Sequence, residues 1–585
     1  MMHLHSSAIN REDERAPPAQ ESSEPEANPP TSAFQLAIAM HPTRELAKSA
    51  LFQIRHETLP KEQQIALSYS RAKAIVQAYG ITAKDLLKFS PKFWQLHTDP
   101  ISTMDGAAAT LCTIQLNLCA GTLARVSIQH PTPEVIDTLN KVLTFEYCGQ
   151  FCLTEVGHGL DAIHLETTAT LLEDGTFELH SPTEKAAKYM APTKPMGDPA
   201  VAIVFARTIV KDEDHGIKPF LVPLNDGYTM HPGVTCKCLP HRGGSRPINH
   251  SITSFNEVKL PYSSLLCGIE KPENPREAFL QHISAVGVGT LAIGSLGVPA
   301  LQVASYICGK YSLRRMYTDA ATGKLTPIIG FRTQKIPVLT ALAQAFVMKA
   351  LHETAVPAFL TTKDPRVSHG IGTIVKTVMM QHALAANLTL ADRCGAQGLF
   401  ESNQITAVFY DIRGIAIAEG DILALSIRLA SELLLRRYQL PPADDPDSIL
   451  AKHEKGLFEE HSAMLKTIGK HRSSDFDRYI LPECLPLVQA IGQRMAYDAA
   501  VRQKLDKTII DMYVASCIKL DPSWYIEKMS MSRSAMREME VRAVDCMFPR
   551  IDELLDELNV EPYITAPISS EKKWKAFLSS VEPYR

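Results

Sequence analysis

The spacing of apolar positions changes along the chain and divides it into segments of different character. From residue 33 to residue 150, apolar side chains recur every three or four positions, as in "PKEQQIALSYSRAKAIVQAYG" (60–80), which predicts helices that bury one face. From 151 to 272, short runs rich in Thr, Val and Ile alternate between apolar and polar positions, which predicts strands. Helical spacing returns over 273–440 and again over 441–585, after the linker-like "LPPADDPD" (440–447).

The strand region is expected to form one compact unit. "EDG" reads as a hairpin turn between its first two runs, and "KDEDHG" reads as a charged turn between the next two. The predicted fold class is therefore α+β, in the order helices, sheet unit, helix bundle, more helices. The predicted strands lie within 164–172, 176–182, 200–210, 217–224, 233–239 and 251–260.

Two segments have a composition of their own. Residues 1–32 are rich in Pro, Glu and Ser and are predicted to be a disordered tail. The uncharged stretch "ISAVGVGTLAIGSLGVPALQVASYI" (283–307) is long enough to cross a bilayer. It is dense in Gly and Ser and contains Pro299, so we expect a buried helix of a soluble domain and no membrane span.

The overall composition excludes some classes of function. A chain of 585 residues with a net charge of -4 is expected to form several domains and offers no basic field for a nucleic acid. Its 12 cysteines are scattered without zinc spacing, so we expect reduced thiols and no metal site. The N-terminus lacks a secretory pattern and "VEPYR" is not a Ser-Lys-Leu address, which predicts a cytoplasmic protein, with the peroxisome left open.

Four motifs occur in one order along the chain. They are "CLTEVGHG" (152–159) with "LETTATL" (165–171), then "SPTEKAAKYM" (181–190), "CGAQGLF" (394–400) and "AIAEGD" (416–421). Together they resemble the acyl-CoA oxidases of the acyl-CoA dehydrogenase and oxidase superfamily. In that pattern a Glu-Gly pair follows the glycine-rich turn by one strand and a turn, and Glu419 lies 20 positions after Leu399.

The resemblance implies a fold and an activity. The implied fold has an N-terminal helical domain (33–150), a central β-barrel (151–272), a four-helix bundle (273–440) and the additional C-terminal helical domain (441–585) of the oxidases. The implied activity is FAD-dependent α,β-dehydrogenation of an acyl-CoA or related acyl thioester. Electrons would pass to O₂ or to an electron-transfer flavoprotein, in a homodimer or homotetramer, and a biosynthetic pathway is a plausible setting.

Glu419 is the predicted catalytic base of this reaction. The α proton of a thioester is a weak acid, so its removal needs a carboxylate whose pKa is raised in a dry pocket. By position alone Glu419 would also suit the start of the helix predicted after it, where acidic residues are common.

Further site residues are carried over from the resemblance. Arg314 and Gln334, in "YSLRRMY" and "GFRTQ", are expected to reach the FAD of a neighbouring subunit. The predicted FAD-binding set is Phe151, Thr154, Gly157, Gly159, Tyr189, Arg314 and Gln334, and the predicted substrate-binding pair is Leu160 and Gly420.

The chain departs from the family pattern at several positions. Tyr189 and Met190 stand where two tryptophans are usual, Asp421 where Thr or Asn is usual, and Leu160 where many dehydrogenases carry Ser. "HRGGSRP" (241–247) reads either as an ordinary sheet-domain loop or as a contact for a CoA phosphate. The departures at Tyr189, Met190 and Asp421 keep a non-catalytic scaffold open as one alternative. A flavin monooxygenase on the same fold is the other, and Glu419 argues against it because such enzymes typically lack the base.

Overall fold

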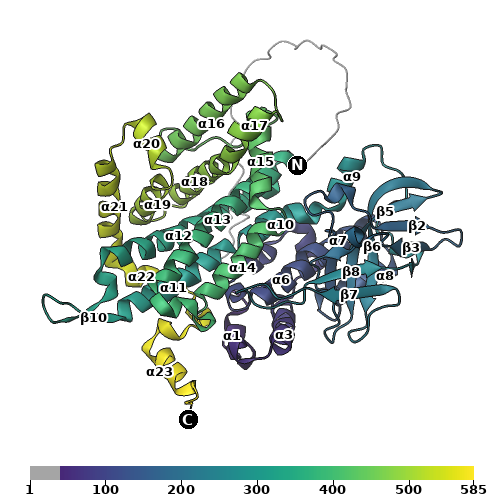
Figure 1. Ribbon diagram of the computed structural model, residues 1–585, viewed down its shortest axis with the longest axis horizontal. Coiled ribbons are helices and arrows are strands. Elements are labelled where there is room, and N and C mark those ends of the chain that lie inside the picture. Colours follow the sequence, from purple (N-terminus) through teal and green to yellow (C-terminus); the bar gives the residue numbers. More distant parts are fainter. Residues whose placement is uncertain (1–39, 585) are drawn as a thin grey trace.

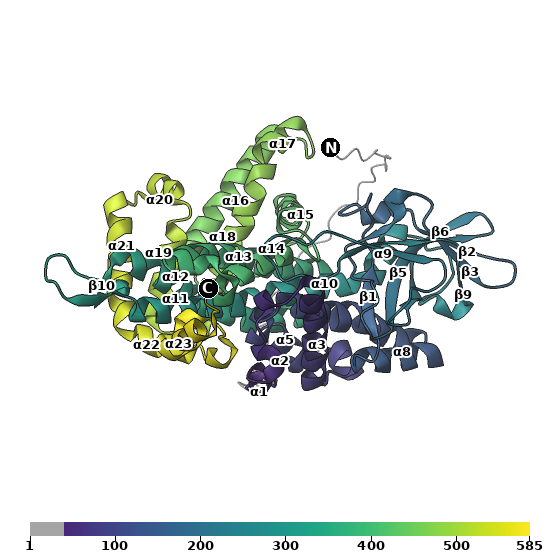
Figure 2. The same ribbon diagram turned by 60° about the horizontal axis from the view of Figure 1, so that its bottom comes forward.

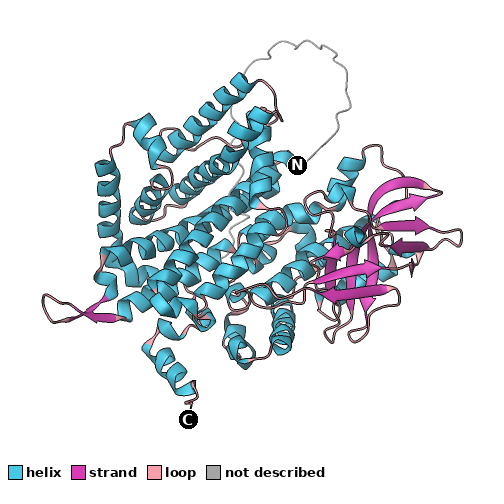
Figure 3. Cartoon of the chain, in the orientation of Figure 1, coloured by secondary structure: helices cyan, strands magenta, loops and turns pink. Residues whose placement is uncertain are grey.

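The structure is a computed structural model that describes residues 40–584. Helices form most of it, and the larger sheets gather at one end of an elongated molecule (Figures 1 and 3). The α+β class predicted from the sequence is confirmed, in the predicted order of helices, sheets, bundle and further helices. The predicted tail, 1–32, lies outside the described residues.

The N-terminal region contains one long apolar helix, Gly106–Gln129, among shorter helices. α3 (Lys61–Tyr79) ends at Gly80, whose left-handed φ of 52° lets its N–H bond the carbonyl of Val76, as the sequence predicted. The apolar run that follows forms α6 (Gly106–Thr113), the π-helix η3 (Ile114–Ala120) and α7 (Gly121–Gln129). The remaining helices of this region are α1 (Arg44–Ala47), α2 (Ala50–Gln53), α4 (Ala83–Lys88), α5 (Pro91–Leu96) and α8 (Pro133–Leu143).

The strand region forms two sheets. A six-stranded sheet has the order β1-β5-β2-β3-β9, with β6 on β5, and a second sheet has the order β4-β8-β7. The central β-barrel of the predicted fold is therefore not confirmed by these pairings. The strands are β1 (Cys148–Cys152), β2 (Thr168–Leu171), β3 (Phe177–His180), β4 (Lys188–Tyr189), β5 (Ala200–Val210), β6 (Glu213–Asn225), β7 (Val234–Cys238), β8 (Ser251–Phe255) and β9 (Val258–Leu260).

Strand β1 corrects the expectation that helical structure runs to residue 150. β1 pairs in parallel with β5, from Cys148 opposite Ala200 to Cys152 opposite Val204. Four of its five residues are buried, so the run "CGQFC" lacks the alternation that reveals a half-exposed strand.

A buried ion pair joins the two sheets. The Nζ of Lys188, in β4, lies 2.9 Å from Oε1 of Glu155, and both side chains are fully buried. Glu155 also accepts hydrogen bonds from the N–H of Glu166 and from the N–H and hydroxyl of Thr167. Lys188 donates a second bond to the carbonyl of Phe205 in β5. The partners lie in β5 and directly before β2, and their hydrogen bonds compensate the removal of both charges from water.

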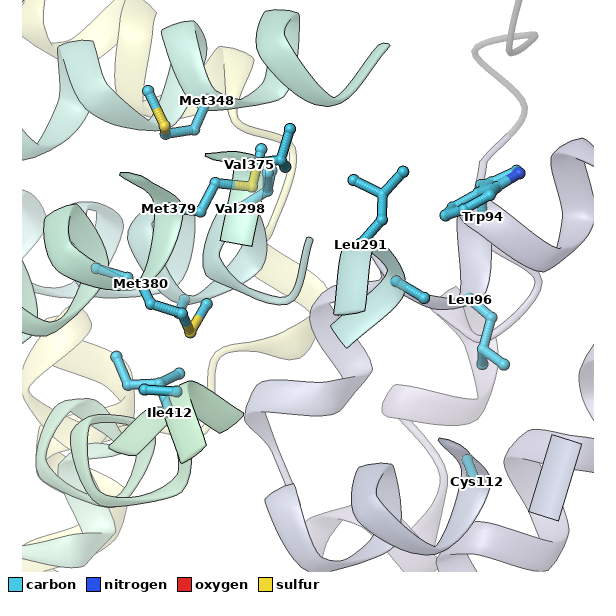
Figure 4. Packing of buried hydrophobic residues seen from close by; sticks show 14 of the residues in the cluster. Trp94, Leu96, Cys112, Leu291, Val298, Met348, Val375, Met379, Met380 and Ile412 are labelled. Atoms are coloured by element: carbon cyan, nitrogen blue, oxygen red, sulfur yellow. The ribbon is translucent and has the colours of Figure 1, made fainter. Parts of the chain in front are cut away.

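The helix bundle contains the span-like segment. α10 (Ser284–Gly294) and α11 (Gly297–Arg314) cover it, and 83% of an 18-residue window is buried in the stretch Ser284–Arg314, as in Gly106–Gln129. Both stretches are apolar and long enough to span a membrane, but most of each window is buried inside the protein. For Ser284–Arg314 this burial confirms the expected core helix. Figure 4 shows Leu291 between the bundle residues Val298 and Met379 and the N-terminal residue Trp94. The other bundle helices are α12 (Arg332–Thr361), α13 (Pro365–Arg393), α14 (Ile405–Ile417) and α15 (Ile422–Leu434), with a short α9 (Pro275–His282) before them.

Two elements here differ from expectation. The segment before the Glu-Gly pair is helix α14, where the sequence motif predicted a strand, because Ile405, Val408, Ile412 and Ala416 recur at helical spacing and are all buried. The hairpin of β10 (Met316–Thr318) and β11 (Leu325–Pro327), which projects from the end of α11, was not predicted (Figure 1).

A C-terminal set of helices packs against the bundle. Gly492 of α18 leaves no room for a side chain, since a Cβ there would lie 2.7 Å from Cβ of Val378 in α13. The structure extends beyond the predicted last helix with α23, which lies at the edge of the molecule (Figure 2). The helices are α16 (Ile449–Ile468), α17 (Ser474–Tyr479), α18 (Cys484–Arg502), α19 (Lys507–Ile518), α20 (Pro522–Met529), α21 (Arg533–Met547), α22 (Ile551–Glu557) and α23 (Glu571–Ser580).

The buried pair yields a test of the sheet region. Lys188→Met leaves the Glu155 carboxylate buried without its cation, which should cost about 3–5 kcal/mol. The double variant Glu155→Leu with Lys188→Met removes both charges and should recover part of that loss. Thermal unfolding followed by circular dichroism measures both, and a Lys188→Met protein that melts with the wild type would contradict this account.

Candidate active site

Two loops of the sheet region are bonded together into one surface, called here the loop platform (154–160 and 185–190). The N–H of Tyr189 donates to the carbonyl of Thr154 at 2.9 Å, and the N–H of Val156 donates to the carbonyl of Ala187 at 2.9 Å. The buried Glu155–Lys188 pair lies beneath these bonds. The structure therefore brings the predicted residues Thr154 and Tyr189 side by side.

The platform presents unbonded polar groups beside exposed apolar side chains. Within residues 40–584, the hydroxyl of Thr154 and the N–H groups of Gly159 and Leu160 have no hydrogen-bond partner. Val156, Leu160 and Tyr189 are 48%, 67% and 37% exposed. Polar edges next to apolar faces suit a flat aromatic ligand with a polar rim, so these residues fit a flavin ring.

The two predicted glycines of the platform differ in their surroundings. A Cβ at Gly157 would lie 2.9 Å from Cβ of Lys185, so this glycine is required by the contact between the two loops. A Cβ at Gly159 would meet nothing within 4 Å, so this side of the loop is open. Phe151, also predicted to bind the cofactor, packs its ring edge-on against Phe205 at 5.0 Å, and the imidazole of His158 contacts Glu166.

Glu419 lies in a short segment of unusual backbone between α14 and α15. Its φ is 51° and that of Gly420 is 97°, so two consecutive residues adopt left-handed conformations. The hydroxyl of Thr290 in α10 donates to the carbonyl of Glu419 at 3.0 Å. The Nζ of Lys376 in α13 donates to the carbonyls of Ala418 and Gly420, the latter at 2.6 Å.

The Glu419 carboxylate faces a space made by a missing side chain. A Cβ at Gly289 of α10 would lie 1.3 Å from Oε2 of Glu419, so only glycine leaves room for the carboxylate there. The amide of Asn117 in η3 lies 3.4 Å from the same oxygen and also donates to the carbonyl of Ala285. A π-helix widens one turn of an otherwise α-helical segment and is frequent at functional sites.

The electrostatics of the site suit a base. Burial raises the pKa of the Glu419 carboxyl well above its ordinary value, and the nearby Lys376 ammonium acts in the opposite direction. Burial likewise lowers the pKa of Lys376, against the pull of Glu419 and Asp421. A carboxylate with a raised pKa binds a proton more strongly than an exposed one, which is the property that general-base catalysis requires.

Asp421 has a structural role that the sequence pattern did not reveal. Its carboxylate accepts hydrogen bonds from the N–H groups of Leu423 and Ala424, at 2.9 and 3.1 Å, and so caps the N-terminus of α15. The acidic residue at this position thus stabilises the helix that begins directly after the Glu-Gly pair.

Arg314 and Gln334 lie together, away from the loop platform. Gln334 is buried and its amide donates to the hydroxyl of Ser312 and to the carbonyl of Arg393. Arg314 donates to Glu571 of α23 and to the carbonyl of Ile568. Arg314 is the last residue of α11 and Gln334 lies in the first turn of α12. The β10 hairpin that follows α11 lies at the opposite end of the molecule from the larger sheets (Figures 1 and 2).

The loop 241–247 contacts the bundle. The N–H of Arg246 lies 3.4 Å from Oδ1 of Asp411 in α14, and a Cβ at Gly244 would lie 2.3 Å from the ring of Tyr410. This loop therefore helps to hold the sheet region on the helix that leads to Glu419.

Four residues around Glu419 were not identified from the sequence: Asn117, Gly289, Thr290 and Lys376. For Lys376 a signal existed, because it is the one Asp, Glu, Lys or Arg residue between Arg366 and Asp392 in an apolar helix. Charged residues in such positions are rarely buried without a specific partner. The predicted substrate residues lie on different parts of the site, Leu160 on the loop platform and Gly420 beside Glu419.

Comparison with known proteins places the chain among relatives of one kind. No family model matches it. It is 22% identical to peroxisomal acyl-coenzyme A oxidase 2 of Arabidopsis thaliana over 416 residues, which are 65% of this chain and 58% of that protein. The chain thus matches less than two thirds of the length of this relative.

Solved structures share the fold over nearly the whole chain. The crystal structure of acyl-CoA oxidase 1 from Yarrowia lipolytica superposes with a TM-score of 0.77 at 15% identity, over 93% of this chain and 90% of that one. Acyl-CoA oxidase-1 of Caenorhabditis elegans, solved in complex with FAD and ATP, superposes with a TM-score of 0.68 at 15% identity, over 94% and 97% of the two chains. The resemblance predicted from the four motifs is confirmed: the named sequence relative and the named solved structures that match this chain are acyl-CoA oxidases.

Proposed function

We propose that this protein is an FAD-dependent oxidoreductase that dehydrogenates an acyl-CoA, or a related acyl thioester, between its α and β carbons. The observation that carries the proposal is Glu419, a carboxylate of raised pKa held on a fixed backbone at the motif position predicted for the base. The unbonded hydroxyl and amides of the loop platform support the cofactor assignment.

Glu419 is proposed to remove the α proton of the thioester. Its carboxylate oxygen would accept this proton. Because Gly289 has no side chain, the carboxylate has room to lie against α10. A positioned general base contributes roughly 10²–10⁴-fold to such a reaction. Bound FAD would supply the acceptor for the β hydride.

The chain's other residues would bind and orient the two ligands. Thr154, Gly159 and Tyr189 of the loop platform would hold the flavin ring, with Phe151 and Gly157 shaping the loop behind it. Leu160 and Gly420 would contact the acyl thioester. Arg314 and Gln334 would serve the FAD of a neighbouring subunit in a homodimer or homotetramer. The β10 hairpin, which follows α11 and its last residue Arg314, lies at the opposite end of the molecule from the larger sheets (Figure 1).

We propose O₂ as the electron acceptor, rather than an electron-transfer flavoprotein. The solved structures that superpose over at least nine tenths of both chains are named acyl-CoA oxidases, and the helices after residue 441 are part of that match. The finer domain description, with a central β-barrel and a four-helix bundle, is proposed on the same likeness. A biosynthetic pathway and a cytoplasmic location stay predictions, beside the peroxisome of the named relative.

The first test concerns the proposed base. Glu419→Gln keeps the size of the side chain but cannot accept a proton, so folding and FAD content should survive. Anaerobic reduction of the flavin by an acyl-CoA that the wild type accepts should slow by at least about a hundredfold. Reduction at the wild-type rate would show that the base lies elsewhere.

The second test uses two glycines of α10. Gly289→Ala places a methyl group where the Glu419 carboxylate lies and should slow flavin reduction at least tenfold, about 1.4 kcal/mol, with FAD content retained. Gly287→Ala meets nothing within 4 Å and should keep the wild-type rate, with an equal or slightly higher melting temperature. Equal rates in the two variants would contradict the placement of the carboxylate.

The third test separates two roles of Arg314. If its guanidinium binds FAD of a neighbouring subunit, Arg314→Ala should lower the flavin content of the purified protein, while Glu571→Gln, which removes only its partner in α23, should not. Flavin absorbance per protein measures both. Equal flavin contents in wild type and Arg314→Ala would remove Arg314 from the cofactor site, and an equal loss in both variants would assign it to docking of α23.

A further inference from the structure

A buried lysine holds the backbone on both sides of Glu419. The side chain of Lys376 is fully buried in the middle of α13, and its Nζ donates to the carbonyl before Glu419 and to the carbonyl after it. Thr290 binds the carbonyl of Glu419 itself. Three successive carbonyls, of Ala418, Glu419 and Gly420, are therefore held by side chains from two other helices.

This segment needs such support because its backbone is unfavourable. Non-glycine residues rarely adopt a positive φ, and such a conformation persists only where the surroundings impose it. Glu419 is such a residue, followed at once by Gly420 with a φ of 97°. The Cα–Cβ bond of Glu419 takes its direction from the backbone of this segment, so the groups that hold the carbonyls also constrain where the carboxylate lies.

The chain contains a second lysine with the same bonding pattern. In β6, Nζ of Lys218 donates to the carbonyls of Gly268 and Glu270, at 2.8 and 2.9 Å, which are likewise two residues apart. Lys218 braces a connection of the sheet region, where no residue of the proposed active site lies. It therefore provides a matched control for the structural effect of losing a lysine clamp.

Among residues 40–584, Lys376 is the one positive charge that acts on the pKa of Glu419. Among the described residues that face Glu419, Thr290 of α10 and Asn117 of η3 are neutral, and the ionisable Cys119 of η3 packs against Gly149 instead. Asp421, on the same connection as Glu419, interacts with Lys376. The ammonium group thus favours the charged form of the carboxylate against its burial.

We propose that Lys376 is a positioning residue of the active site, whose ammonium group clamps the carbonyls of Ala418 and Gly420 and so fixes the direction and charge of the Glu419 carboxylate. This role rests on the proposed function of Glu419 as the base. It gives a purpose to a lysine that would otherwise be an expensive charge in an apolar helix.

The proposal makes a signed prediction for pH dependence. A base acts when deprotonated, so flavin reduction rises with pH through the pKa of Glu419 and then levels off. Lys376→Met keeps an unbranched side chain one atom shorter but removes the charge, which raises the pKa of Glu419 further. The acidic limb of the rate profile should therefore move to higher pH by about one unit or more. Lys376→Arg keeps the charge and should leave the limb near its wild-type position.

The experiment has two readouts on FAD-loaded wild type, Lys376→Met, Lys376→Arg and Lys218→Met. The first is the pH profile of anaerobic flavin reduction at saturating acyl-CoA. The second is amide hydrogen exchange, by mass spectrometry, of peptides that span 415–425 and 266–272, which needs no turnover. Lys376→Met should speed exchange only in 415–425, and Lys218→Met only in 266–272, with an unshifted acidic limb.

The outcomes decide the clamp separately from the enzyme activity. If none of the acyl-CoAs tested reduces the flavin of the wild type, the proposed function fails. The exchange data alone then decide whether Lys376 holds the segment. Wild-type exchange over 415–425 together with an unshifted limb in Lys376→Met would overturn the proposal. Should that variant not fold, Lys376→Arg decides, because its longer head group should speed exchange in 415–425 if the clamp exists and leave it unchanged if not.

Discussion

The site depends first on a pair of opposite charges that never meets water. Glu155 and Lys188 lie 2.9 Å apart and are fully buried, and the remaining capacity of the carboxylate is taken by Glu166 and Thr167. Because a buried charge without a partner is costly, the two loops that carry them cannot separate without a large loss of free energy. The backbone bond from Tyr189 to Thr154 directly above the pair is therefore fixed before any ligand arrives. Pre-organisation of this kind lowers the entropy that binding must overcome.

One turn of π-helix connects this platform to the proposed base. Gln115 of η3 accepts a hydrogen bond from the N–H of Gly149 at 2.6 Å. Its amide donates to the carbonyl of Val142 in α8 and to that of Tyr147, directly before β1. Two residues later, Asn117 reaches the carboxylate of Glu419. The same seven-residue element thus touches the strand that leads to Thr154 and the carboxylate on the bundle side. A displacement of η3 would be felt at both places, which couples the position of the base to that of the platform.

The motifs could be predicted because each is local, and their partners could not. Glu419 and Gly420 adjoin in sequence, and the run 200–210 shows its strand by β-branched residues alone, which β5 confirms. Asn117 lies 302 positions from Glu419, and no pattern within one chain reveals a contact of that separation. α14 shows the opposite failure: its branched residues resemble a strand, but its buried face recurs at helical spacing, and packing overrides propensity. Asp421 illustrates a third case, since a residue that departs from a motif proved to cap a helix.

The environment of Glu419 combines two opposing requirements. Burial alone would keep the carboxyl protonated, and a protonated acid cannot take the α proton. A carboxylate fully paired with a cation would have a low pKa and would be too weak a base to remove the α proton. Lys376 donates its hydrogen bonds to the carbonyls of Ala418 and Gly420, so its charge acts on Glu419 without a direct bond.

Because the folded pKa of Glu419 is raised, its contribution to stability is present at low pH and is lost as the pH rises through that value. The depressed pKa of Lys376 has the opposite dependence: its contribution is present at high pH and is lost as the pH falls through its folded value. Both groups therefore ionise less easily in the folded chain than in water, and the tightly packed helices α10 and α13 supply the stability that this arrangement consumes.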